Sequence, residues 1–271
     1  MKKFYKKIYA VFFTILVFSG CASNPLTGKK TMAFVNNSSL FPMAFAEYDS
    51  FLNEHNVIKN TPEAQMVERV GARLAQAAQR WLESEGYGHY LNDYRWEYNL
   101  VEDDAVNAWC MPGGKIVVYT GILPFTQTEE GLAVVMGHEI AHALLNHGQQ
   151  NMSAGILQQI GALGVLVATS GMSESAQSLS MLAYDTGSTI AGTLPFSREH
   201  ESEADRYGTI LMAIGGYNPD EAVPFWERMS ALGGSTLELL STHPSSATRI
   251  RDLRAMIPEA KQVAASFGVY Y

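Results

Sequence analysis

The pentapeptide His138-Glu139-Ile140-Ala141-His142 restricts the fold and the chemistry of this chain more than any other segment. The residues on either side, 131–136 and 143–145, are apolar and uncharged, which predicts a buried helix. Such a helix tolerates three ionisable side chains only if something compensates their burial. Positions i and i+4 share one helix face, so His138 and His142 can bind one zinc ion, with Glu139 beside a zinc-bound water. The pentapeptide therefore predicts a metal site in the core.

Residues 1–20 have the organisation of a secretory signal peptide. An apolar run at 8–18 is too short to span a bilayer, which needs about twenty residues. Ser19 and Gly20 directly precede Cys21, as in a bacterial lipobox, so we expect Cys21 to be lipidated after cleavage. An ordinary cleaved signal, or a signal anchor with an incidental thiol at Cys21, are the alternatives. The positive residues that precede the run are Lys2, Lys3, Lys6 and Lys7.

Cleavage at this point has consequences for charge and stability. It removes four lysines and no acids, so the net charge changes from −8 to −12, which argues against nucleic acid as a partner. A lipidated Cys21 leaves Cys110 as the only thiol, so the fold has no internal disulfide. We expect residues 21–35 to form a lipidated tether and residues 36–271 to form one domain.

Hydrophobic periodicity predicts an α+β domain that is mainly helical and has a small β-sheet. The predicted helices are 45–55, 62–85, 198–214, 219–231 and 246–256, and the predicted strands are 94–101, 106–111 and 115–120. Thr126 and Glu129 have the spacing of a capping box and are expected to begin the helix of the pentapeptide.

Two segments between these elements have less definite patterns. Residues 152–168 are apolar enough to suggest a membrane span. Gln158 and Gln159 interrupt this segment, and it falls short of about twenty residues, so a core helix is the favoured interpretation. Residues 172–193 are rich in serine, glycine and threonine, which favours a mobile loop.

The pentapeptide needs a third ligand, because catalytic zinc usually takes three protein ligands and a water. One peptidase class places glycine and histidine where this chain has Leu145 and Gly148, so that class is excluded. His147 lies five residues after His142 and is therefore turned off the ligand face. We expect it to be a residue at the end of the helix.

An acidic segment further along the chain offers a better candidate. Glu201 and Asp205 share a helix face with Ala204 and Gly208, whose small size would let this helix pack closely on the zinc helix. Glu201 can then bind the metal, and Asp205 can accept a hydrogen bond from the outer nitrogen of a ligand histidine. The alternative is that the whole segment is a solvated helix surface, as we expect for Glu199 and Glu203.

Five motifs in this order resemble those of the gluzincin metallopeptidases related to HtpX and to the BepA-type, Oma-type and CAAX-prenyl proteases. The motifs cover most of the mature chain and are Asn107-Ala108-Trp109 with Pro112-Gly113-Gly114, His138-Glu139-x-x-His142, Arg198-x-x-Glu201-x-Glu203-Ala204-Asp205, Gly216-Tyr217-Asn218-Pro219 and His243-Pro244-x-x-x-x-Arg249. The resemblance implies a zincin-like metallopeptidase domain with one zinc ion per chain.

The resemblance also implies a zinc-dependent endopeptidase that cleaves peptides or unfolded proteins, such as misassembled envelope proteins. Glu139 would be the general base, and Asn107 and Ala108 would lie on an edge strand that pairs with an extended substrate. Ala22 after Cys21 favours an outer-membrane lipoprotein facing the periplasm if the host is Gram-negative. A non-enzymatic binding module with structural zinc is the alternative, although such a site would not need Glu139.

His243 has three possible roles at this stage. By resemblance it occludes the zinc as a fourth ligand or stabilises the oxyanion during catalysis. From its position alone, it could begin the last helix. Arg249 either stabilises charge or pairs with an acid.

Overall fold

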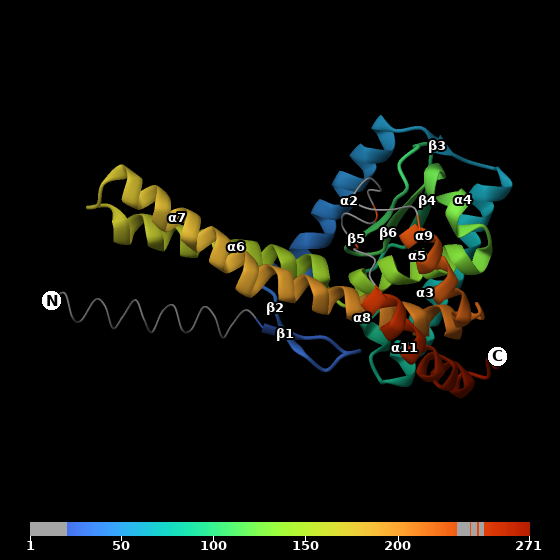
Figure 1. The fold of residues 1–271 in the computed structure, drawn as a ribbon. Helices are drawn as coiled ribbons and strands as arrows, with labels where there is room; N and C mark the ends of the chain where they lie inside the picture. The colour runs from blue at the N-terminus through green and yellow to red at the C-terminus, as the bar shows by residue number, and fades with distance from the viewer. Residues whose placement is uncertain (1–20, 232–238, 240–242, 244–246) are drawn as a thin grey trace.

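The computed structural model describes residues 21–231, 239, 243 and 247–271. The signal-peptide prediction for residues 1–20 lies outside this part of the chain. A helical body surrounds a four-stranded sheet, and two long helices project from the body (Figure 1). This arrangement confirms the predicted α+β class.

Helix α5 (Glu129–Leu144), which carries the pentapeptide, is buried along almost its whole length. It packs against α3 (Pro62–Ser84) and α8 (Leu194–Ile214), and α11 (Ala247–Ser266) lies on the other side of α8. The N-cap of α5 is Thr128, whose side chain accepts a hydrogen bond from Gly131 N. The capping box predicted at Thr126 is therefore wrong. Thr126 is buried at the end of α4 (Leu123–Thr126) and donates to the carbonyl of Leu123.

The sheet has the strand order β3-β4-β6-β5. Its strands are β3 (Val57–Ile58), β4 (Glu97–Val101), β5 (Ala108–Met111) and β6 (Lys115–Tyr119). β4 and β6 are parallel, and the other two pairs are antiparallel. The predicted turn between β5 and β6 is present, with positive φ angles at Gly113 and Gly114. β5 is the last strand in this order, so the predicted edge position is confirmed.

Helix α2 (Asn37–Glu54) crosses the sheet, where the Tyr48 hydroxyl donates to the carbonyl of Ile116. It begins eight residues before the predicted start, because Asn36 caps it by accepting from Ser39 N. The predicted helix at 219–231 is divided into η4 (Pro219–Glu221) and α9 (Ala222–Ala231). The remaining short turns are η1 (Gly88–Leu91) and η2 (Thr120–Ile122).

The segment expected to be a tether forms an antiparallel hairpin of β1 (Cys21–Ser23) and β2 (Lys30–Met32). Asn24 in its turn is buried and donates to the carbonyl of Leu144, the last residue of α5. Tyr207 of α8 donates to the carbonyl of Leu26. The hairpin therefore packs on the end of the helix that carries the pentapeptide.

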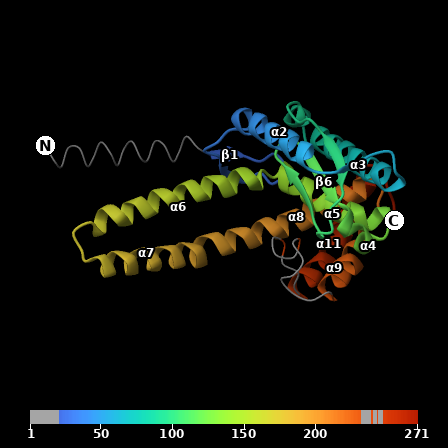
Figure 2. The same ribbon diagram turned by 90° about the horizontal axis from the view of Figure 1, so that it is seen from above.

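Helices α6 (His147–Thr169) and α7 (Glu174–Ser188) form the projecting pair (Figure 2). A π-helical turn, η3 (Thr189–Thr193), joins α7 to α8. Two predictions are wrong here: residues 152–168 are not a core helix, because little of that helix is buried, and residues 172–193 are mainly helical and not a loop. The two helices pack because Gly161 leaves room for Tyr184, whose hydroxyl donates to the carbonyl of Gln158.

Candidate active site

The close approach of α5 and α8 brings the candidate ligands together. A Cβ added at Gly208 would lie 2.8 Å from the backbone nitrogen of His138, and one added at Gly137 would lie 2.9 Å from the carbonyl oxygen of Gly208. The two backbones can therefore meet only because both positions are glycine. The close packing expected from the small residues of α8 is confirmed. It places Glu201 across from His138 and His142.

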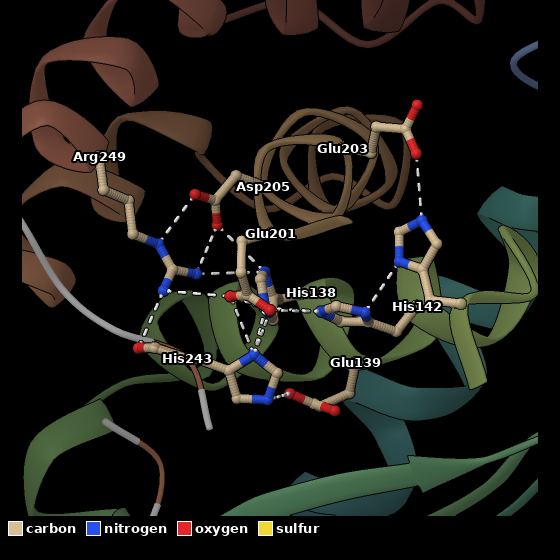
Figure 3. Close-up of polar contacts among 9 residues, drawn as sticks. His138, Glu139, His142, Glu201, Glu203, Asp205, His243 and Arg249 are labelled. Carbon is tan, nitrogen blue, oxygen red and sulfur yellow. Dashed lines mark hydrogen bonds and ion pairs between the residues drawn. The ribbon is translucent and has the colours of Figure 1, made fainter. Parts of the chain in front are cut away.

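Four side chains meet at one point between these helices (Figure 3). His138, His142, Glu201 and His243 each offer one ligand atom, and these atoms lie within 4.8 Å of one another. We call these four residues the donor cluster. His138 Nε2 lies 3.1 Å from both His142 Nε2 and His243 Nδ1, and Glu201 oxygens lie 3.3 Å from His142 Nε2 and 2.8 Å from His243 Nδ1.

These separations fit a zinc ion. Zinc–nitrogen bonds of about 2.0–2.1 Å in tetrahedral geometry place ligand atoms about 3.3 Å apart. His138 and His142 turn their outer Nδ1 atoms to other partners, so their Nε2 atoms face each other at 3.1 Å. Two imidazole nitrogens that converge in this way can both bind one cation. Nitrogen and carboxylate ligands suit zinc, so the donor cluster fits the predicted cofactor.

The outer nitrogen of His138 contacts Asp205. His138 Nδ1 lies 3.0 Å from Asp205 Oδ1, and Arg249 donates to both oxygens of that carboxylate at 2.6 and 2.8 Å. Arg249 also lies flat over the Trp226 ring, with its guanidinium carbon 3.4 Å from the ring centroid. These bonds hold the Asp205 carboxylate against His138 Nδ1–H, which leaves Nε2 free to bind metal.

His142 has an outer partner that the sequence analysis missed. His142 Nδ1 lies 2.9 Å from Nδ1 of His147, and His147 Nε2 lies 3.1 Å from Glu203 Oε2. Lys29 of the N-terminal hairpin binds Glu203 at 2.7 Å. His142 Nδ1–H therefore donates to His147, which in turn donates to Glu203. His147 is buried, and Glu203 is mostly buried, so Glu203 is not the solvated charge that the sequence predicts.

His147 is not a member of the donor cluster, as predicted, but it does not end α5. Asn146 adopts a left-handed conformation, with φ 58° and ψ 33°, and α6 begins at the next residue. His147 is therefore the first residue of α6, and its position cannot be derived from the helix geometry of α5. Asparagine is one of the residues that adopt the left-handed conformation at the end of a helix. Asn146, directly after an apolar helix, is therefore the sequence signal for this break.

His243 occupies the remaining corner of the donor cluster and also contacts Glu139. Its Nδ1 faces the other ligand atoms, and its Nε2 lies 3.4 Å from Glu139 Oε1. Arg249 holds the backbone here by donating to the carbonyl of His243 at 3.2 Å. His243 does not begin the last helix, because α11 starts at Ala247.

The environment of the site changes the acidities of its groups. Burial raises the pKa of Glu139, although the charges of two nearby histidines oppose this shift. Burial would also raise the pKa of Glu201, but hydrogen bonds from the three cluster histidines lower it below its ordinary value. Burial lowers the pKa of His142 well below its usual range. A neutral His142 and an ionised Glu201 are the forms that bind a metal, and a raised pKa suits Glu139 to accept a proton near neutral pH.

The predicted substrate-binding residues do not contribute side chains to the donor cluster. Asn107 is 7% exposed, and its side-chain oxygen accepts from the backbone nitrogen of Ala108. The backbone carbonyl of Asn107 accepts from Tyr119 N, and Ala108 pairs with Val118. Any contact of these two residues with a peptide would therefore come from their backbone.

Comparison with known proteins agrees with this geometry. The mitochondrial metalloendopeptidase OMA1 of Schizosaccharomyces pombe is 37% identical over 174 residues, which are 63% of this chain and 49% of that protein. The mitochondrial metalloendopeptidase OMA1 of Danio rerio is 29% identical over 263 residues, 93% of this chain and 53% of that protein. The beta-barrel assembly-enhancing protease of Escherichia coli is 28% identical over 162 residues, 57% of this chain and 33% of that protein.

The chain spans about half the length of the OMA1 relatives and a third of the Escherichia coli one. The model of peptidase family M48 matches residues 62–257, which include strands β4, β5 and β6, helices α5 and α8 and all four residues of the donor cluster. Because this match covers most of the sequence, the chain belongs to peptidase family M48.

Proposed function

We propose that this protein is a zinc-dependent endopeptidase whose zinc is held by His138, His142 and Glu201. The convergence of their ligand atoms beside the buried carboxylate of Glu139 carries the proposal. Zinc bound there supplies Lewis-acid polarisation of a carbonyl oxygen. Glu139 would accept the proton of the attacking water and pass it to the leaving amine. Asp205 would fix the orientation of His138.

The test is the metal content of the purified mature chain together with its cleavage of an unfolded protein. We expect about one zinc per chain, and cleavage that a chelator removes and added zinc restores. A His138→Ala, His142→Ala, Glu201→Ala triple variant should lose both zinc and cleavage. His55→Ala, which changes an exposed histidine, is the matched control. Full zinc retention in the triple variant would contradict the ligand assignment.

A structural-zinc binding module is the second candidate, because four ligands close the donor cluster as they do in structural sites. The position of Glu139 argues against it. Glu139 is 5% exposed, and its Oε1 makes no hydrogen bond and only a 3.4 Å contact with His243 Nε2, which is a costly arrangement that a structural site would not require. We therefore favour the peptidase, with His243 as a removable fourth ligand.

In this proposal His243 blocks the site in the resting enzyme. Its Nδ1 fills the corner that water and substrate need, and its Nε2 contacts the general base. Leu239 lies next to His243, whose backbone nitrogen donates to its carbonyl. The backbone nitrogen of Leu239 donates to the carbonyl of Val106, just before the edge strand, so Leu239 would also compete with an extended peptide.

Whether His243→Ala raises or lowers the rate of cleavage tests this role. We expect faster cleavage of an unfolded test protein with zinc content unchanged, because a competitor for the open position is removed. A fall in turnover of about 10²–10³ would indicate oxyanion stabilisation. Turnover equal to that of the parent would reject both roles.

We also propose that the protein is an extracytoplasmic lipoprotein, attached through Cys21, that cleaves unfolded or misassembled envelope proteins. The signal-like residues 1–20 and the small residues before Cys21 support the anchor. The beta-barrel assembly-enhancing protease among the relatives supports envelope substrates, whereas the OMA1 relatives are mitochondrial.

Labelling with a fatty-acid analogue tests the lipid anchor. The label should mark the parent chain and not Cys21→Ala, whereas Cys110→Ala should label like the parent. Equal labelling of the parent and Cys21→Ala would contradict lipidation at this residue.

A further inference from the structure

The projecting pair of helices, residues 147–188, carries most of the large apolar side chains that are exposed in the described part of the chain; we call it the α6–α7 arm. Figures 1 and 2 both show its tip far from the body. Among the described residues, nine of the thirteen exposed large apolar side chains lie on the arm or just after it, where Val167 is 75% exposed. These nine are Met152, Ile160, Leu163, Leu166, Val167, Met172, Leu179, Leu182 and Leu194.

The composition of the arm differs from that of an ordinary surface helix. No Asp, Glu, Lys, Arg or His occurs from residue 148 to 173. Within the described part of the chain, α6 is the one helix that is long and apolar enough to cross a membrane by length and composition, and little of it is buried in the protein. A surface that faces water over such a length would normally carry charges.

The exposed apolar surface of α6 is too wide for one partner helix. At 3.6 residues per turn, the exposed positions from Leu166 through Ile160 to Ala168 cover about 200° of the helix. α7 adds Leu179 and Leu182 on its own exposed face. A second copy of the chain would cover one stripe and leave the rest in water, whereas lipid can cover the whole arc.

Several polar side chains of the arm form hydrogen bonds within the helix pair. Gln158 Nε2 donates to Asp185 Oδ1 and Ser188 Oγ, at 3.3 and 3.2 Å. The hydroxyls of Thr169 and Ser180 donate to backbone carbonyls one turn earlier in their own helices. Internal satisfaction of polar groups is what a lipid environment requires, because lipid offers them no partner.

We infer that the α6–α7 arm is a membrane-binding element that lies in the interface of a lipid bilayer. Exposed Gln159, Glu174 and Asp185 set the depth, because charged side chains are strongly disfavoured at the centre of a bilayer. The arm therefore lies along the surface, with its apolar side chains about 5–10 Å deep among the headgroups and upper acyl chains.

The root of the arm lies beside the hairpin that begins at Cys21. Phe34 N donates to Ser153 Oγ at 3.1 Å, and Gln149 Nε2 donates to the carbonyl of Val35 at 2.5 Å, which fixes the segment after β2 on α6. A lipid on Cys21 and the arm would thus reach the same leaflet. Membrane binding by the arm goes beyond the proposed peptidase function. Its test requires neither peptidase activity nor a lipid on Cys21.

Flotation with vesicles of phosphatidylcholine and phosphatidylethanolamine tests this inference. The chain from residue 21 with Cys21→Ser should float with the vesicles, and high salt should not release it, because neither the lipids nor the arm supplies charge pairing. Leu163→Glu with Val167→Glu, and separately Leu179→Glu with Leu182→Glu, should each reduce the floating fraction about tenfold or more. Met43→Glu with Tyr270→Glu changes exposed apolar residues outside the arm and should float like the parent.

Two readouts separate membrane binding from folding and catalysis. Zinc content and cleavage of a soluble peptide should be equal in the parent and the arm variants, because the arm residues lie outside the donor cluster. A parent chain that stays with the soluble fraction, or arm variants that float as well as the parent, would overturn the inference. An arm-dependent dimer in light scattering without flotation would overturn it in favour of a second copy.

Discussion

Asp205 and His147 hold the outer nitrogens of the two pentapeptide histidines, but the two contacts differ in chemistry. Asp205 is a buried carboxylate, and the charge of Arg249 keeps its pKa below the usual range although burial opposes this. His147 is neutral, because burial lowers its pKa, and it passes a hydrogen bond on to Glu203. An anionic partner makes a histidine a stronger ligand than a neutral one does.

We expect Asp205→Ala to weaken zinc affinity by about 10–100-fold, as the loss of such outer partners typically does. The same change leaves Arg249 buried without its carboxylate, so the protein should also lose stability. Asp205→Asn keeps an acceptor for His138 and should lie between the parent and the alanine variant. Chelator titration measures the affinities, and an unchanged affinity in Asp205→Ala would contradict the contact.

His147→Ala should weaken zinc affinity by about tenfold, because His142 loses the acceptor that fixes its ring. Lys29→Ala provides the matched control at the far end of the same chain of bonds. Lys29 is about half exposed, and surface ion pairs are worth about 0–1 kcal/mol, so its removal should change the affinity only slightly. Equal effects of the two variants in the same titration would contradict the role of His147.

At the scale of elements, the site depends on how closely α5 and α8 approach. The contact is between backbones, so no flexible side chain can move to make room for an added methyl group at Gly208. Helix propensity alone would favour alanine there by about 1 kcal/mol. The two effects oppose each other, and the clash with the backbone at 2.8 Å should dominate.

Gly208→Ala should therefore lower the free energy of unfolding by about 1–3 kcal/mol and reduce zinc retention. Gly187→Ala is the matched control, because Gly187 lies in α7 with nothing within 4 Å of an added Cβ. That variant should be neutral or slightly more stable. Chemical denaturation of both variants measures the difference, and a stabilised Gly208→Ala would contradict the close approach.

Over the whole molecule, the sequence predicts the helical body better than it predicts the N-terminal hairpin and the α6–α7 arm. The pentapeptide and the small residues of α8 identified two elements that meet at the site, because periodicity reports which residues share a helix face. Periodicity cannot report what covers that face, so it predicts a core helix for the apolar α6, although little of α6 is buried. Composition predicts a loop for the serine-rich α7, because the packing on α6 that stabilises α7 cannot be read from local composition.

The motifs also do not predict contacts between residues that lie far apart in the sequence. Lys29 reaches Glu203 across 174 residues, and Asn24 reaches Leu144 across 120. Both Lys29 and Asn24 belong to residues 21–35, for which the sequence predicts a tether. Polar residues such as these give no sign of burial. The hairpin thus connects the expected lipid attachment point to the outer partners of the zinc ligands.

The cleavage rate of Glu139→Gln, measured with its zinc content, tests the central claim of a zinc peptidase most directly. Glutamine has nearly the shape of glutamate but cannot accept the proton of water, and it removes none of the donor cluster residues. We expect zinc content equal to that of the parent and a turnover at least about 10²-fold lower on an unfolded test protein. Turnover near that of the parent, with zinc bound, would contradict the account.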